Sequence, residues 1–437
     1  MNDRNAEPLL PVELGAGKVK FARGMKAGRW VFATGLMAQD FAQDLVHGIA
    51  PDVLAERTPH AGRPKREKET LRIYENLDAV LRAAGTDRTN LVRTDQYYTT
   101  VKAVPPYQQV RREFLGGRIP PSTSIAQRGM LLPGADMTIQ ALGVIPQAGF
   151  EVTHLKHEQL AGRPTSGYSP ALTAGDFVFI PGVTSLAVGD EPKRNGVAAA
   201  ALMTEGAQWA DQPIKLETEF LITRRMVQSL ALAGATLDDV VHAQVYLTDP
   251  DDYSAFNETW TRHFSKSPPT LDIIPCIPHG LAPYDGKIEI NVIAMKGGAA
   301  RKKHVDAGVV TAFAQQPQAV KAGDLLFMSG LMAIDRDGLV PHAAADPKQP
   351  YFFSAAEAQA EFIIGNIAKL CEAAGTSLRN VVRILQFHTD LAEFYPVYKV
   401  WERNLEGRPV PFSAIEVPSP LPVPGATVMI EAWAYAP

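Results

Sequence analysis

Apolar and polar positions follow the same order three times along the chain. Each time, a short apolar strand is expected to end near a glycine, and the segments read GRWVFATGLMAQD (28–40), GDFVFIPGVTSLAVGD (175–190) and GDLLFMSGLMAIDRDG (323–338). Their central glycines, Gly35, Gly182 and Gly330, are 147 and 148 residues apart. Such a fixed spacing indicates an internal repeat.

A second signature follows each of these strands: an amphipathic helix that ends in Ala-Gly, and then another strand. In the first copy Leu71, Tyr74, Leu77 and Leu81 recur at helical spacing. A glycine after the helix accepts a positive φ without a Cβ clash, and the three copies have one there: Gly85, Gly234 and Gly375. The strands that follow are rich in Val, Ile, Tyr and Phe, which favour sheets.

The third signature is a second helix, a proline-rich loop and a closing strand. In the middle copy the apolar face of that helix is Tyr253, Phe256, Trp260 and Phe264. The loops cover 118–136, 267–286 and 408–427, and the closing strands cover 137–145, 287–295 and 428–436.

These signatures predict an α+β fold in which one face of a mixed sheet is covered by two helices. An early hairpin is expected before the first glycine of each unit. The other sheet face needs burial, and three copies that pack these faces together would provide it. The predicted domains are 1–150, 151–298 and 299–437.

Taken together, the three signatures resemble the RidA family over nearly the whole chain. The resemblance rests on the strand ending in Ser-Gly or Thr-Gly, the helix ending in Gly, the Val-rich strand ending in Thr-Asp, and the closing strand similar to Ile-Glu-Ile-Glu-Ala. RidA proteins are homotrimers that bind ligands in the clefts between subunits. The resemblance therefore implies a single-chain pseudo-trimer with three clefts, which are free to differ. Whether the pseudo-trimer associates further stays open.

The resemblance also implies where ligand-binding side chains should lie. RidA deaminases bind the substrate carboxylate with an arginine after the second helix, and the matching positions here are Ser122, Thr270 and Pro411, none of which can replace a bidentate guanidinium. Arg128 and Arg408 are nearby in the sequence and are candidate substitutes, although solvated loop charges are the alternative.

The family's water-positioning glutamate matches Gln140, Asn291 and Glu431, so only the third copy keeps the acid. The serine of the Ser-Gly motif matches Thr34, Pro181 and Ser329. Glu431 and Ser329 are therefore the candidate catalytic residues, against the alternatives of a structural acid and a turn-forming serine. The other candidate substrate-binding residues, besides Arg128, are Asn257 and Tyr398 on the second helix and Gln140 and Asn291 on the closing strands.

Composition narrows the range of partners. A formal net charge of −4 gives no electrostatic reason to expect nucleic acid or an anionic membrane. Two cysteines fit a reducing compartment, and no signal peptide or membrane-spanning run is recognised, so the cytoplasm is expected. No cofactor motif is found. Cys276 with His279, and His154 with His157, lack further ligands, so no metal site is expected.

Three functions stay open from the sequence. The first is hydrolysis of an imine, an enamine or a related C–N bond at an inter-domain cleft, with Glu431 positioning the water. The second is another hydrolase or lyase reaction on this fold, of the ring-opening or chorismate type. The third is a pseudo-trimer that binds a small molecule without catalysis.

Overall fold

The three large sheets of the described residues share one strand order, and two small sheets have two strands each. The computed structural model describes residues 5–14, 19–41, 49–54, 62–157, 160, 166–204, 206, 211–313, 315–345, 348 and 351–437. The sheet orders are β1-β2-β3-β7-β4-β5, β8-β9-β10-β15-β13-β14 and β16-β17-β18-β23-β21-β22, and β6 adds a seventh strand to the third sheet. In each copy the last two strands in this order pair in parallel, and the other pairs are antiparallel.

The elements of the first copy are β1 (Glu7–Leu14), β2 (Val19–Ala27), β3 (Trp30–Leu36), α1 (Pro51–Leu54), α2 (Lys65–Ala84), β4 (Leu91–Tyr98), α3 (Val104–Leu115), β5 (Ser122–Ala126), β6 (Gly129–Met130) and β7 (Met137–Val144). Those of the second are β8 (Val152–Leu155), β9 (Ala171–Ala174), β10 (Phe177–Thr184), β11 (Lys193–Arg194), β12 (Val197–Ala198), α4 (Pro213–Phe220), α5 (Val227–Leu232), β13 (Val240–Leu247), α6 (Tyr253–Phe264), β14 (Thr270–Pro275) and β15 (Ile288–Met295). Those of the third are β16 (Lys302–Val305), β17 (Ala319–Ala322), β18 (Leu325–Met328), β19 (Ile334–Asp335), β20 (Gly338–Leu339), α7 (Ala355–Ala373), β21 (Val381–His388), α8 (Phe394–Asn404), β22 (Phe412–Glu416) and β23 (Val428–Tyr435).

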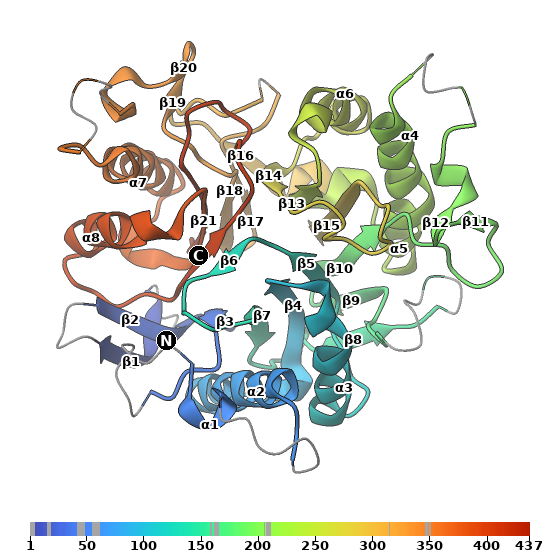
Figure 1. The fold of residues 1–437 in the computed structure, drawn as a ribbon, viewed down its shortest axis with the longest axis horizontal. Coiled ribbons are helices and arrows are strands. Elements are labelled where there is room, and N and C mark those ends of the chain that lie inside the picture. Colours follow the sequence, from blue (N-terminus) through green and yellow to red (C-terminus); the bar gives the residue numbers. More distant parts are fainter. Residues whose placement is uncertain are drawn as a thin grey trace.

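The helices lie at the rim of the molecule and the sheets lie toward its middle (Figure 1). Every residue of the central strands β4, β13 and β21 is buried, so both faces of each strand are covered. Helices cover one face and the other copies cover the second, so even the polar run Arg93–Gln96 of β4 is buried. The predicted α+β class is confirmed, and so are the early hairpins.

The first helices end as their glycines predict. The N–H of Gly85, at φ 83°, donates to the carbonyls of Arg82 and Leu81 and so closes α2. Gly234 and Gly375 also have positive φ. In the second copy a π-helical segment, Leu221–Met226, joins α4 to α5, a feature that the sequence pattern does not reveal. None of the helices in the described ranges is long and apolar enough to cross a membrane.

The three copies share one apolar core. Trp30 of the first copy meets Phe177 of the second edge-on at 5.0 Å, and Phe32 meets Trp433 of the third at 6.4 Å. Polar contacts also join the copies, because the hydroxyls of Tyr97 and Tyr246 lie 2.7 Å apart.

The glycine that closes the first strand of the repeat lies where two copies meet. In β3 the pairing register shifts between Ala33 and Leu36, and Gly35 occupies this bulge at φ 71°. A Cβ on Gly35 would lie 2.1 Å from the carbonyl oxygen of Phe412, which belongs to the third copy. Only glycine fits there.

Gly35→Ala is therefore expected to cost about 3 kcal/mol or more, since the left-handed backbone and the overpacking each cost about 1–3 kcal/mol. Gly85→Ala is the matched control, because Gly85 is also left-handed but has nothing within 4 Å of its Cβ position. Urea unfolding of both variants measures the difference. Equal losses would show that the two copies do not approach each other at Gly35.

Candidate functional site

Strand register defines which residues are equivalent in the three copies. Gln140 pairs with Asp95, Asn291 with Gln244, and Glu431 with Leu385, at the same point of each sheet. The match of Gln140, Asn291 and Glu431 that the sequence suggests is therefore the match that the sheets show.

The same register corrects the positions matched to the family's arginine. Thr94, Ala243 and Ile384 pair with Ser122, Leu271 and Phe412. The three matched residues are therefore not all equivalent: Thr270 and Pro411 correspond to Pro121, one residue before Ser122, because prolines in loops of different length do not preserve strand register. None of the corrected residues is an arginine, so that binding group is still absent from these positions.

At two of the three interfaces between copies, the residue at the position of Glu431 is a neutral amide that hydrogen-bonds to the neighbouring copy. Gln140 accepts the Gly35 N–H at 2.6 Å and donates to the Ser413 hydroxyl of the third copy at 2.9 Å. Asn291 donates to the Thr123 hydroxyl of the first copy at 2.9 Å. Both amides are buried and serve the packing of the copies.

The third interface, between the second and third copies, has carboxyl groups instead. Glu431 is fully buried, accepts a hydrogen bond from the Gln244 amide, and lies 3.5 Å from Nε of Arg383. Asp272 of the second copy is also fully buried, and its burial together with the nearby Glu431 carboxylate raises its pKa well above the ordinary value.

The candidate serine lies at this same interface. The hydroxyl of Ser329 accepts the Leu271 N–H at 3.1 Å and donates to the Pro317 carbonyl at 2.7 Å. Neither Ser329 nor Glu431 is among the described residues that line the four cavities of about 950, 680, 10 and 10 Å³. That Glu431 positions water for a substrate stays a prediction, and this geometry gives it no support.

The structure does not bring the other candidates together. Arg128 is exposed and lies 3.6 Å from the Glu416 carboxylate. The buried Tyr398 hydroxyl accepts the Lys20 N–H at 2.6 Å, which fastens α8 to β2 of the first copy. Asn257 borders a crevice of about 10 Å³ at the interface of the second and third copies.

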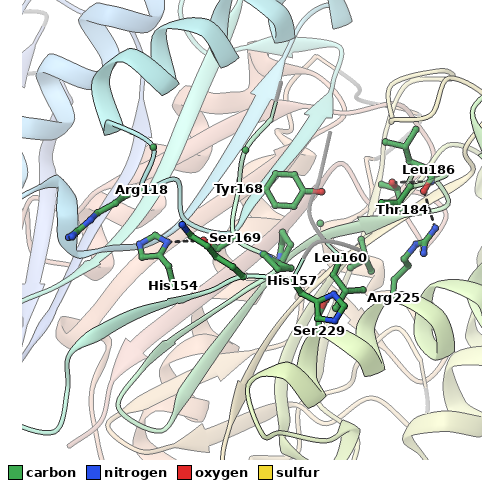
Figure 2. A pocket seen from close by; sticks show the side chains of 18 of the residues that line it. Arg118, His154, His157, Leu160, Tyr168, Ser169, Thr184, Leu186, Arg225 and Ser229 are labelled. Carbon is green, nitrogen blue, oxygen red and sulfur yellow. Dashed lines mark hydrogen bonds between the residues drawn. The ribbon is translucent and has the colours of Figure 1, made fainter. Parts of the chain in front are cut away.

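The open cleft lies between the first and second copies. Its volume is about 950 Å³, which is enough for a small metabolite. Gly117 and Arg118 line it from the first copy, and β8, β10 and the π-helical segment line it from the second. Figure 2 shows Arg118, His154, Tyr168 and Arg225 around this space.

The wall of this cleft is basic. Its ionisable lining residues in the described ranges, apart from Tyr168, are Arg118, His154, Lys156, His157 and Arg225, and no carboxylate is among them. Burial and the charges of Arg118 and Lys156 lower the pKa of His154, whose Nδ1 lies 2.7 Å from the Ser169 hydroxyl. Arg225 donates to the Leu186 carbonyl at 3.1 Å and pairs with Glu191 behind the wall. Such a field favours an anionic ligand.

A buried acid lies next to one residue of the cleft wall. The register shift between Ile180 and Val183 leaves Pro181 and Gly182 facing the cavity. A Cβ on Gly182 would lie 1.8 Å from Oε1 of Glu289, so this carboxyl packs against a residue of the cleft wall, although Glu289 is itself buried and is not among the described lining residues. Burial, with a smaller effect of Asp95, raises the pKa of Glu289 to about 8.

Sequence reasoning passed over Glu289. The strand KIEINVIAM holds polar residues at Glu289 and Asn291, and only Asn291 was matched to the family's acid. An acid between two isoleucines in an otherwise apolar strand was the available signal.

Comparison with known proteins extends these findings. The family model described as Endoribonuclease L-PSP matches residues 159–296 and 309–436. A RutC family protein of Saccharolobus solfataricus is 32% identical over 136 residues, which cover 31% of this chain and 92% of that protein. A protein of Escherichia coli named as the reactive intermediate deaminase TdcF is 24% identical over 90 residues, 20% of this chain and 70% of that protein.

Among solved structures, RidA from an Antarctic Psychrobacter is 30% identical, with a TM-score of 0.25, over 30% of this chain and 98% of its own. A chorismatase is 14% identical, with a TM-score of 0.46, over 79% of this chain and 93% of its own. The family model matches more than half of the chain. Together with three sheets of one strand order, this match shows that the chain belongs to the RidA, or endoribonuclease L-PSP, family.

Proposed function

We propose that the protein hydrolyses a C–N bond, of the imine or enamine class, in a small anionic molecule bound between the first and second copies, with Glu289 as the acid–base group. The observation that carries this proposal is the contact of the buried Glu289 carboxyl with Gly182, a residue that lines the cleft. The name of the related TdcF, a reactive intermediate deaminase, supports the bond type.

The chemistry needs one group that gives and takes a proton. Hydration of a C=N bond adds the hydroxyl of water to carbon and a proton to nitrogen; the C–N bond then breaks and leaves a carbonyl compound and ammonia. A carboxyl with a pKa of about 8 is protonated at neutral pH and can donate to the nitrogen. The resulting carboxylate can accept the proton that the attacking water loses.

The basic wall supports an anionic substrate. Arg118 enters from the first copy and Lys156 and His157 from the second, so a carboxylate or phosphate would be held by charges from both copies. These side chains occupy a different place from the arginine of the family's deaminases, and their role does not depend on it.

The test is ammonia release from a panel of freshly generated imines and enamines, each as an anionic and a neutral analogue. Glu289→Gln is expected to lower turnover by about 10²–10⁴-fold, the usual contribution of a general acid–base group. The anionic analogues are expected to be the better substrates. Glu69→Gln is the control, because Glu69 is a buried carboxyl of α2 and is not among the described residues that line the cleft.

Three results would change this assignment. If Glu431→Gln rather than Glu289→Gln abolished release, the chemistry would lie at the interface of the second and third copies. If no substrate were turned over while an anionic analogue bound stoichiometrically in calorimetry, the protein would be a binding protein. The amides of Gln140 and Asn291, which replace the family's acid at two interfaces, favour that alternative. If neither turnover nor binding were found, the cleft would not be the site.

A further inference from the structure

The three interfaces can be compared at three equivalent positions, and one interface differs at all of them. Strand register makes His242 equivalent to Arg93 and Arg383, and Asp272 equivalent to Thr123 and Ser413. Two interfaces thus combine a guanidinium, a hydroxyl and an amide. The interface of the second and third copies combines an imidazole and two carboxyls: His242, Asp272 and Glu431.

The imidazole of His242 presents a lone pair to the two carboxyls. The Thr270 hydroxyl donates to the Val241 carbonyl at 3.2 Å, so its oxygen accepts the Nδ1–H of His242 at 2.9 Å. Nε2 is then unprotonated, fully buried and without a hydrogen-bond partner. A hydrogen bond from one ring nitrogen that fixes the other as a ligand is the usual arrangement of a metal-binding histidine.

The distances fit a shared cation better than direct hydrogen bonds. Nε2 of His242 lies 3.5 Å from Oδ2 of Asp272 and 3.7 Å from Oε1 of Glu431, which is beyond hydrogen-bond range. Two ligands at about 2.0–2.2 Å from a tetrahedral ion lie about 3.3–3.6 Å apart. Both Asp272 oxygens and Oε1 of Glu431 also have no hydrogen-bond partner among the described residues.

We propose that His242, Asp272 and Glu431 bind a divalent transition-metal ion that joins the second and third copies. One imidazole nitrogen with carboxylate oxygens suits Zn²⁺ and neighbouring first-row ions, whereas Mg²⁺ and Ca²⁺ prefer oxygen ligands alone. The second Asp272 oxygen or a water molecule completes the coordination.

The surroundings hold the ligands in place. Phe327 stacks on the His242 ring at 5.5 Å, and Trp433 meets it edge-on at 5.1 Å. Arg383 lies over Trp433, and its Nε is 3.5 Å from Oε1 of Glu431. The Glu431 carboxylate would therefore contact both this guanidinium and the metal ion. The ligands come from two copies and are fully buried, so the ion enters as the copies assemble and its role is structural.

The test measures metal in the whole 437-residue chain. The chain is produced in zinc-supplemented medium, washed with a chelator and examined by plasma mass spectrometry, and a second sample is refolded with Co²⁺ alone and examined by visible absorption. About one ion per chain is expected, with the spectrum of four-coordinate Co²⁺. Glu431→Gln, which restores the amide of the first copy, should weaken binding by at least about 10–100-fold, and Thr270→Val by a similar factor.

Glu69→Gln is again the control and should keep the metal, and the melting temperature of each variant establishes that it folds. Absence of stoichiometric Zn²⁺ and Co²⁺ binding in the wild-type protein would overturn the proposal and leave a proton shared by Asp272 and Glu431. Binding that Glu431→Gln and Thr270→Val leave unchanged would place the metal elsewhere and would also overturn it. Neither result bears on the cleft at Glu289, which ammonia release tests separately.

Discussion

Arg93→Leu is expected to lower the free energy of unfolding by about 3–5 kcal/mol, because it leaves a buried carboxylate without its partner. Arg93 and Asp95 are both about 2% exposed, and Nε of Arg93 lies 3.0 and 2.9 Å from the two Asp95 oxygens. The same guanidinium donates to Oε1 of Gln244 in the second copy at 2.9 Å. The substitution therefore removes an ion pair within the first copy and a hydrogen bond between copies.

Urea unfolding measures this loss, and two variants show its cause. Arg93→Leu with Asp95→Leu should recover most of the stability, because replacing both ions removes the unpaired charge. Arg379→Leu removes an exposed pair with Glu406, and should change stability by less than about 1 kcal/mol. A loss below 1 kcal/mol for Arg93→Leu would mean that water or Arg383, 3.6 Å from Asp95, already compensates that carboxylate.

Glu289→Gln is expected to stabilise the protein at alkaline pH. Burial raises the pKa of Glu289 from 4.5 to about 8. Between these values the folded protein holds the proton and the unfolded chain has lost it, so unfolding releases a proton and rising pH favours unfolding. The stability that this bound proton contributes is fully present below pH 4.5 and is lost as pH rises through 8. The Glu289→Gln variant has no such loss. Relative to acid pH, its free energy of unfolding should gain about 4–5 kcal/mol over that of the wild type at pH 9.

Urea unfolding of both proteins between pH 4.5 and pH 9 tests this dependence. The difference between the two proteins is needed, because Glu69 and Glu217 also have pKa values raised to about 7 and act on both curves alike. Glu406→Gln, at an exposed position, is the control for the substitution itself. A constant gap between wild type and Glu289→Gln would mean that Glu289 is ionised throughout this range.

The fold could be predicted from local signals, because each copy repeats them. The glycines after the first helices, the apolar helix faces and the buried strands all reappear where the pattern placed them. The π-helical segment could not be predicted, since its apolar spacing differs little from that of an α-helix over one turn.

The site was harder to predict, because it depends on contacts between copies. Glu431 was chosen for its chemistry, but whether a strand residue faces a cleft or another copy depends on the partner sheet. Glu289 and Asp272 illustrate this dependence. Both are acids in apolar strands, yet Glu289 packs against Gly182 beside the cleft and Asp272 faces His242. Arg118 and Lys156 gave no signal, since basic residues near loops are common.

Strand β6 has a consequence for assembly. It leaves the first copy and pairs with β22, the edge strand of the third sheet, through Gly129 and Met130. At the next interface Ala126, the last residue of β5, accepts main-chain hydrogen bonds from Ile277 and donates one to Gly280 of the second copy. A head-to-tail contact of this kind polymerises unless rotation closes it. Here these contacts are made within one chain, so the Ile415–Glu416 end of the β22 edge is already paired and is less open to a strand from another molecule.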